Sequence, residues 1–486
     1  MDKKVKNKLD KDANDDNEIM LKTDLMKGTD FTETTIEISA NNVLDEMSVF
    51  SIFKNLVTIG VAFMLLFSAF NSFTFLQSSL NKEDGLGTSG LASVYGSMVL
   101  TNLFITPLTL ARFSEKWIIV GSMSTYIVYV ITGFYPAWST VIPGSLIIGF
   151  GAAHLWLAVQ AYITDIAKRY AIITKTKFQD RVHLFLGIFY AFTYTSNIWG
   201  NLISSFVFRR TTVKNTTSDI LAVCGPKYCP FKEMNNSIIT PPTHKQVYIF
   251  TGCCAGMGLL ALILMLLSLT NTSSGGHKVT SVFKKLKLVT VHIFTSRNQF
   301  LLTFATLLGG LANGFTAGDF TSAYISCPYG IESVGFVMIT FGVSQSMFSV
   351  IFGKLNQYTG HIPIYIFGFI TQMAAYVALL QWTPRVEDYA VVYILAALFG
   401  IGGAIHSPLV SALYNVYFSK DRDVALSSFR VISSAGGTIA FGYSSWLCTV
   451  YKVYILISLL SVSLITIILL DILHRKDVKR SKCSMK

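Results

Sequence analysis

The chain has 486 residues, of which 52% are apolar and only 14% are charged. That balance excludes a soluble protein, because so much apolar side chain exceeds what soluble cores can bury. The formal net charge of +12 is spread over short segments between apolar runs. We therefore attribute it to membrane topology and expect a lipid bilayer, and no nucleic acid, as a partner.

The first segment, residues 1–53, is polar and of mixed charge. It contains neither the short apolar stretch nor the small-residue cleavage site of a removable signal peptide. We expect a largely disordered cytoplasmic tail, with the first long helix targeting the chain to the membrane.

Runs of about 20 apolar residues, each long enough to cross the hydrocarbon core of a bilayer, follow this tail. The first six are Leu56 to Leu80, Ser89 to Ala111, Trp117 to Tyr135, Val141 to Ala161, Leu184 to Phe208 and Val247 to Leu269. The next six are Phe300 to Asp319, Val334 to Gly353, Pro363 to Trp382, Tyr389 to Tyr414, Val431 to Val450 and Val453 to Leu473. This predicts an all-α polytopic membrane protein with twelve transmembrane helices in two halves, 54–270 and 299–473. A linker, 271–298, joins the halves, and a basic tail, 474–486, follows them.

The distribution of Lys and Arg predicts the orientation of these helices. The short loops of one side contain only Lys82, Arg385 and Lys452. The loops after helices two, four, six, eight and ten are rich in basic residues, including Arg112, Lys168, Arg169, Lys284, Lys354, Arg422 and Arg430. We therefore place these loops, the linker and both termini in the cytoplasm, and expect the plasma membrane as the location.

The long fifth loop, 209–246, falls on the opposite side and carries two glycosylation sequons, at Asn215 and Asn235. We expect both to be glycosylated, whereas Asn271, also in a sequon, faces the cytoplasm and stays unmodified. Cys224 and Cys229 lie between the sequons, close enough to form a small disulfide-closed ring in an oxidising compartment. Two free thiols are the alternative.

An internal repeat relates the two halves. The fourth and tenth helices share a Gly-Ala-X-His segment ending at His154 and His406, and the first and seventh share an Asn-X-Phe-Thr segment beginning at Asn71 and Asn313. Because six helices separate the matched segments, both halves run in the same direction. This parallel repeat is typical of the major facilitator fold, which places a cavity between its halves near the middle of the membrane.

Several segments resemble the unc-93-like branch of the major facilitator superfamily, in order and in spacing. They are Leu76 to Leu80, Gly85 to Gly87, Trp199 to Ser205, Gly353 to Gly360 and Phe441 to Ser444. The tenth helix departs from the family, which has an acidic residue, Trp, Gln and Thr where this chain has Gly403 to Pro408.

The resemblance implies a multi-pass protein that regulates other membrane proteins. One family member is similar to an accessory subunit of a two-pore potassium channel in muscle, and another resembles an escort for nucleic-acid-sensing receptors. We therefore expect a regulatory subunit, most directly of a potassium channel. A secondary transporter of a small solute and a trafficking escort are the alternatives.

Few residues suggest chemistry at membrane depth. We find no nucleotide-binding loop, catalytic triad or metal-ligand spacing, and we expect neither an enzyme nor a cofactor. Cys253, Cys254 and Cys448 are interpreted as packing residues. His154 and His406 are the deepest ionisable candidates, either as a cavity pair or as neutral histidines hydrogen-bonded between helices.

Two further groups of residues have both a packing and a functional interpretation. Asn71, Asn313, Asn197, Gly200 and Asn201 either pack helices closely or line the cavity. Gly353 and Gly360 belong to a cytoplasmic loop signature of major facilitator transporters, but Gln357 and Tyr358 replace its usual Asp and Arg. Because those charges latch the two halves in one state of the transport cycle, their absence favours a non-transporting protein or an altered cycle.

Overall fold

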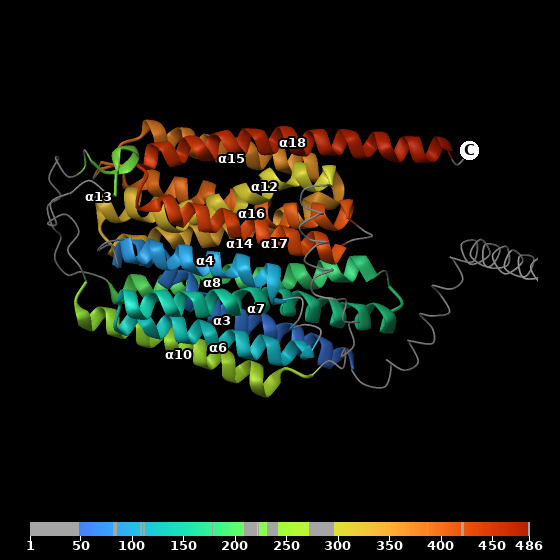
Figure 1. Cartoon of the computed structure of the whole chain (residues 1–486), viewed down its shortest axis with the longest axis horizontal. Coiled ribbons are helices and arrows are strands. Elements are labelled where there is room, and N and C mark those ends of the chain that lie inside the picture. The colour runs from blue at the N-terminus through green and yellow to red at the C-terminus, as the bar shows by residue number, and fades with distance from the viewer. Residues whose placement is uncertain are drawn as a thin grey trace, which may run out of the picture.

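The computed structural model describes residues 48–80, 85–106, 109, 112–176, 178–208, 221, 223–230, 242–271, 296–385, 387–418 and 422–484. Within these ranges the protein is helical and contains no strand. Figure 1 shows one elongated bundle in which the helices of the first half lie beside those of the second.

Six long helices form the first half. They are α3 (Val49–Leu80), α4 (Leu86–Phe104), α6 (Glu115–Ile131), α7 (Trp138–Ile173), α8 (Phe178–Val207) and α10 (His244–Ser268). Local signals set several of their ends. Gly85, with a φ of 70°, precedes α4, and Thr243 forms a capping box with Gln246 at the start of α10.

The second half also has six long helices. They are α12 (Arg297–Gly314), α14 (Glu332–Thr359), α15 (His361–Gln381), α16 (Tyr389–Tyr417), α17 (Arg422–Ser444) and α18 (Thr449–Ser484). The π-helical segment η4 (Phe315–Ser326) and the short α13 (Cys327–Tyr329) continue α12.

Several boundaries in the second half were predicted wrongly, and two of them bear on the site. The seventh helix does not end at Asp319, because the following Thr321 and Ser322 are buried and donate hydrogen bonds to preceding carbonyls of the same segment. The eleventh helix starts at Arg422 and not at Val431, so Arg430 lies inside it. Hydropathy alone did not find either extension, because polar or charged residues interrupt both.

Nine helices of the described residues are long and apolar enough to cross a membrane, which supports the predicted all-α polytopic fold. The three other long helices are α4, α8 and α17. They carry polar residues such as Thr88, Asn197 and Ser433 at the boundary between the halves. Twelve crossings therefore remain a prediction for these three helices.

The halves meet most extensively through two helix pairs, α4 with α17 and α8 with α14, and α3 also contacts η4. Small residues allow the close approach. A methyl group added at Gly335 of α14 would lie 2.6 Å from the carbonyl oxygen of Asn201 in α8. In the other pair, the ring of Tyr95 packs against Gly437 and stacks on Phe441 at 5.5 Å. The close packing makes the two halves one body.

Two disulfide bonds mark one end of the bundle. Cys224 bonds to Cys327, and Cys229 bonds to Cys448. We call this the disulfide end, and we call the opposite end, where α3 begins and α18 finishes, the terminal end (Figure 1).

The predicted Cys224 to Cys229 ring is therefore wrong, and Cys448 is not a simple packing residue. The segment between the two cysteines forms a short 3-10 turn, Gly225–Lys227, that lies on the second half. Its Tyr228 is buried and accepts a hydrogen bond from the Thr449 amide at 3.0 Å. Each sulfur consequently meets a partner that is 103 or 219 residues away in the sequence.

Candidate functional site

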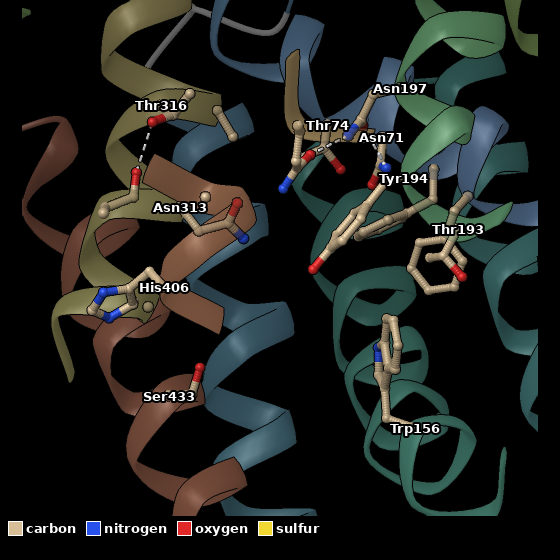
Figure 2. A pocket seen from close by; sticks show the side chains of 18 of the residues that line it. Asn71, Thr74, Trp156, Thr193, Tyr194, Asn197, Asn313, Thr316, His406 and Ser433 are labelled. Carbon is tan, nitrogen blue, oxygen red and sulfur yellow. Dashed lines mark hydrogen bonds between the residues drawn. The ribbon is translucent and has the colours of Figure 1, made fainter. Parts of the chain in front are cut away.

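A cavity of about 300 Å³ lies between the two halves near the middle of the bundle. Its walls come from both halves, as Figure 2 shows for Trp156, Thr193 and Tyr194 on one side and Asn313 and His406 on the other. That volume is at the small end of the range for ligand pockets. The cavity stands where the parallel repeat predicts it.

A chain of amide side chains crosses the cavity between the halves. Asn71 of α3 donates to the side-chain oxygen of Asn197 in α8 at 2.7 Å, and Asn197 donates to Gln345 of α14 at 3.0 Å. Asn71 also donates to Ser196 at 3.1 Å. Because Gln345 belongs to the other half, this chain helps to fix how the halves lie against each other.

The predicted histidine pair is only half realised at the cavity. His406 lines it, and its Nε2 donates to the Ala305 carbonyl at 2.6 Å. His154 does not border it. Its Nδ1 donates to the Phe150 carbonyl at 2.8 Å, and its Nε2 lies 2.6 Å from the Thr109 hydroxyl. Both rings are thus held by partners within the protein, which favours the structural interpretation of the pair.

Two of the five predicted packing or cavity residues, Gly200 and Asn201, pack helices rather than line the cavity. A methyl group at Gly200 of α8 would lie 2.0 Å from the Ser68 carbonyl oxygen of α3, so no larger residue fits there. Asn201 donates to the Asn197 carbonyl at 2.6 Å and is fully buried. Asn71, Asn197 and Asn313, by contrast, border the cavity.

Arg430 brings a positive charge to the cavity wall. Its guanidinium lies 5.3 Å from the centre of the Trp156 ring in α7 and 5.6 Å from that of Phe429. The sequence placed Arg430 in a cytoplasmic loop, because the polar residues before it hide the first turns of α17. The structure corrects that placement.

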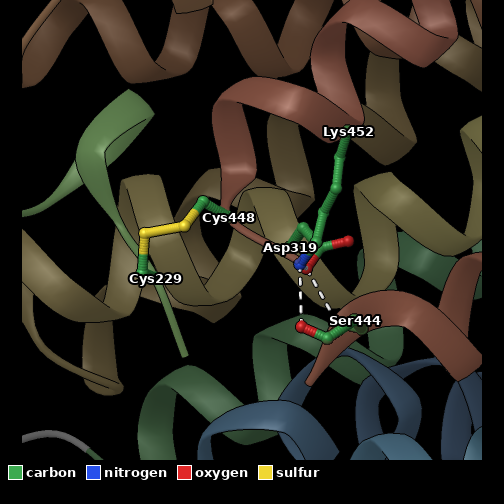
Figure 3. The surroundings of a disulfide bond; sticks show 5 residues. All are labelled: Cys229, Asp319, Ser444, Cys448 and Lys452. Atoms are coloured by element: carbon green, nitrogen blue, oxygen red, sulfur yellow. Dashed lines mark hydrogen bonds and ion pairs between the residues drawn. A yellow bond between two sulfur atoms is a disulfide. The ribbon is translucent and has the colours of Figure 1, made fainter. Parts of the chain in front are cut away.

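A buried ion pair near the disulfide end was also missed. Lys452 of α18 lies 2.6 Å from Oδ1 of Asp319, and the exposed fractions of their side chains are 0% and 2%. Ser444 donates to the same oxygen at 2.7 Å, and Lys452 donates to the Ser444 carbonyl at 2.8 Å (Figure 3). The ion pair and its hydrogen bonds link η4 to α17 and α18, beside the Cys229–Cys448 bond.

The described ion pairs beside the loop signature at the terminal end lie within the second half. Gly360 has a φ of 76°, which favours glycine, whereas a methyl group at Gly353 would meet nothing within 4 Å. His361 and Arg475 both pair with Asp471, at 3.4 and 2.8 Å. The described charges at this site therefore do not latch one half to the other.

Several sequence predictions lie outside the described residues. These are the sequons at Asn215 and Asn235, most of the N-terminal tail and nearly all of the linker. Within the described ranges, no three His, Cys, Asp or Glu side chains gather as metal ligands would.

Solved structures of similar shape show the fold. The nucleoside transporter NupG superposes with a TM-score of 0.58 at 13% identity, covering 85% of this chain and 98% of the transporter. The peptide transporter POT superposes with the same TM-score at 12% identity, covering 87% of this chain and 94% of that one. Both support the major facilitator fold predicted from the repeat.

Sequence relatives show the family. The model of the family described as "Ion channel regulatory protein UNC-93" matches residues 77–469. Protein unc-93 homolog A of Xenopus laevis is 36% identical over 437 residues, which are 88% of this chain and 95% of the relative. A Caenorhabditis elegans protein named as a potassium channel regulatory protein, unc-93, is 26% identical over 84% of this chain and 59% of its own length. The chain belongs to the UNC-93 family.

Proposed function

We propose that this chain is a regulatory subunit of another membrane protein, a potassium channel in the first instance. The family match over residues 77–469 is the observation that carries the proposal. The similarity to the nematode protein over most of this chain supplies the kind of partner.

The terminal end of the bundle supports a regulator over a transporter. Transporters of this fold use charges in the loop after the eighth helix to latch their halves together. Here Asp471 pairs with Arg475 of α18 and lies 3.4 Å from His361 of α15, and Gln357 and Tyr358 stand in the signature. The Asp and Arg that usually form the latch between the halves are therefore replaced by uncharged residues in this loop.

The disulfide end gives the proposed orientation. Disulfide bonds form in oxidising compartments and are rare in the cytosol. Cys224–Cys327 and Cys229–Cys448 therefore support an outer position for this end, with both termini in the cytoplasm. The excess of Lys and Arg in the loops of the terminal end supports the same orientation, and we propose the plasma membrane as its location.

A transporter of a small solute is the second candidate, because the central cavity and the similarity to solved transporters favour it. One experiment separates the two. The tagged full chain is crosslinked in native membranes and purified, and its co-purifying proteins are identified.

A potassium channel recovered with the chain, and absent from an untagged control, supports the regulator. Solute uptake by the purified chain alone in liposomes would contradict it. A receptor recovered in place of a channel would favour a trafficking escort.

A further inference from the structure

Arg430 is a cation at the central cavity, and none of the described carboxylates balances it. Asp319 and Asp471 neutralise the buried Lys452 and the peripheral Arg475, but no described carboxylate pairs with Arg430. Its contacts are the faces of two aromatic rings, Trp156 and Phe429. A cation at membrane depth is costly unless it meets a counter-charge or a water-filled cavity. Arg430 is therefore poised for an anion that enters the cavity.

The guanidinium keeps its hydrogen-bonding capacity. Ring faces attract the charge, but they do not accept the planar fork of N–H donors, which matches the two oxygens of a carboxylate. Trp156 is held in place by Phe67, with the ring centres 5.1 Å apart. Arg430 of α17 and Trp156 of α7 therefore lie together at the cavity, each on a helix.

The rest of the wall defines the body of the ligand. Tyr190 and Tyr194 line the cavity beside Trp156, and Asn197 adds an amide. Flat aromatic surfaces pack against flat apolar groups. A cavity of about 300 Å³ suits a small molecule better than a whole lipid.

We propose that the central cavity binds a small organic monoanion, whose carboxylate pairs with Arg430 and whose flat apolar body packs against Trp156. Arg430 belongs to the second half and Trp156 to the first, so the ligand would bridge the halves. Occupancy would then stabilise one relative position of the halves. The proposal concerns ligand binding alone and does not depend on which membrane protein the chain regulates.

The test uses matched ligands that differ only in charge. Benzoate and 2-naphthoate are titrated into the purified full chain in detergent by calorimetry, alongside benzamide and 2-naphthamide. We expect saturable binding of at least one carboxylate, and an affinity at least tenfold lower for its neutral amide. Arg430→Gln should lower the carboxylate affinity at least tenfold, and Arg430→Lys should lower it less, because the charge remains without the fork. Arg475→Gln, at a side chain that is 70% exposed, is the control and should bind as the native chain does.

The proposal is overturned if neither carboxylate binds saturably, if the amides bind equally well, or if Arg430→Gln binds like the native chain. Should Arg430→Gln fail to fold, Trp156→Phe provides the second measurement. Carboxylate binding should quench the tryptophan fluorescence of the native chain, and Trp156→Phe should remove most of the change. A quench that is unaltered in this variant would place the ligand elsewhere.

Discussion

The replacement Lys452→Met tests the buried ion pair, because it leaves the Asp319 carboxylate without its cation. The two charged atoms lie 2.6 Å apart and neither side chain has more than 2% exposure. Ser444 would remain as a single donor to Oδ1, and Oδ2 already has no hydrogen-bond partner. Removing one member of a buried pair typically costs about 3–5 kcal/mol. We expect a loss of that size in the free energy of unfolding.

The double variant Asp319→Asn, Lys452→Met sharpens this test. With both charges gone, no uncompensated charge is buried, so we expect the double variant to be more stable than Lys452→Met alone. Unfolding is measured on the purified full chain in mixed micelles. Arg475→Met is the matched control. It breaks a pair of similar distance, 2.8 Å, in which Arg475 is 70% exposed and Asp471 is 14% exposed, and which should be worth about 1 kcal/mol or less.

The reasoning is refuted if Lys452→Met destabilises the chain no more than Arg475→Met does. It also fails if the double variant is as unstable as the single one, because the cost would then come from lost packing and not from a stranded charge.

Three further predictions follow from the disulfide end and the boundary between the halves. Peptide mapping without reductant should recover Cys224 linked to Cys327 and Cys229 linked to Cys448, and a peptide linking Cys224 to Cys229 would contradict the structure. Gly335→Ala should destabilise the fold by about 1–3 kcal/mol, because its methyl group meets the Asn201 carbonyl at 2.6 Å. The control is Gly353→Ala, whose methyl group enters open space in a helix. This control should be neutral or stabilising by up to about 1 kcal/mol. Equal losses of stability in the two variants would show that the close contact at Gly335 is unimportant. Glycosidase treatment of single Asn→Gln variants should show glycans at Asn215 and Asn235 but none at Asn271. A glycan at Asn271 would contradict the proposed orientation of the chain in the membrane.

The fold could be predicted because its signals are local and repeated. Long apolar runs mark the helices, and the matched segments at His154 and His406 relate the two halves. The central cavity followed from that repeat, and Asn71, Asn197, Asn313 and His406 do line it.

The missed features depend on contacts that local patterns cannot reveal. Cys224 and Cys229 are close in sequence, but each bonds to a distant cysteine, so spacing gave the wrong pairing. Asp319 and Lys452 were assigned to a helix end and a loop, since a charged residue interrupts an apolar run whether or not it is buried. Arg430 follows a polar stretch that forms the first turns of α17 and so was assigned to a loop. The sequence did contain one signal for the ion pair, because Asp319 and Lys452 are isolated charged residues beside long apolar runs.

We propose that this chain acts on a potassium channel. The most direct test of this proposal is the current of a two-pore potassium channel, recorded in cells with and without the full chain, with the surface amount of the channel measured in parallel. We expect the current for each channel at the surface to change when the chain is present. We expect no change when an unrelated major facilitator transporter is expressed in its place. A current that is identical with and without the chain, while both proteins reach the surface, would contradict it.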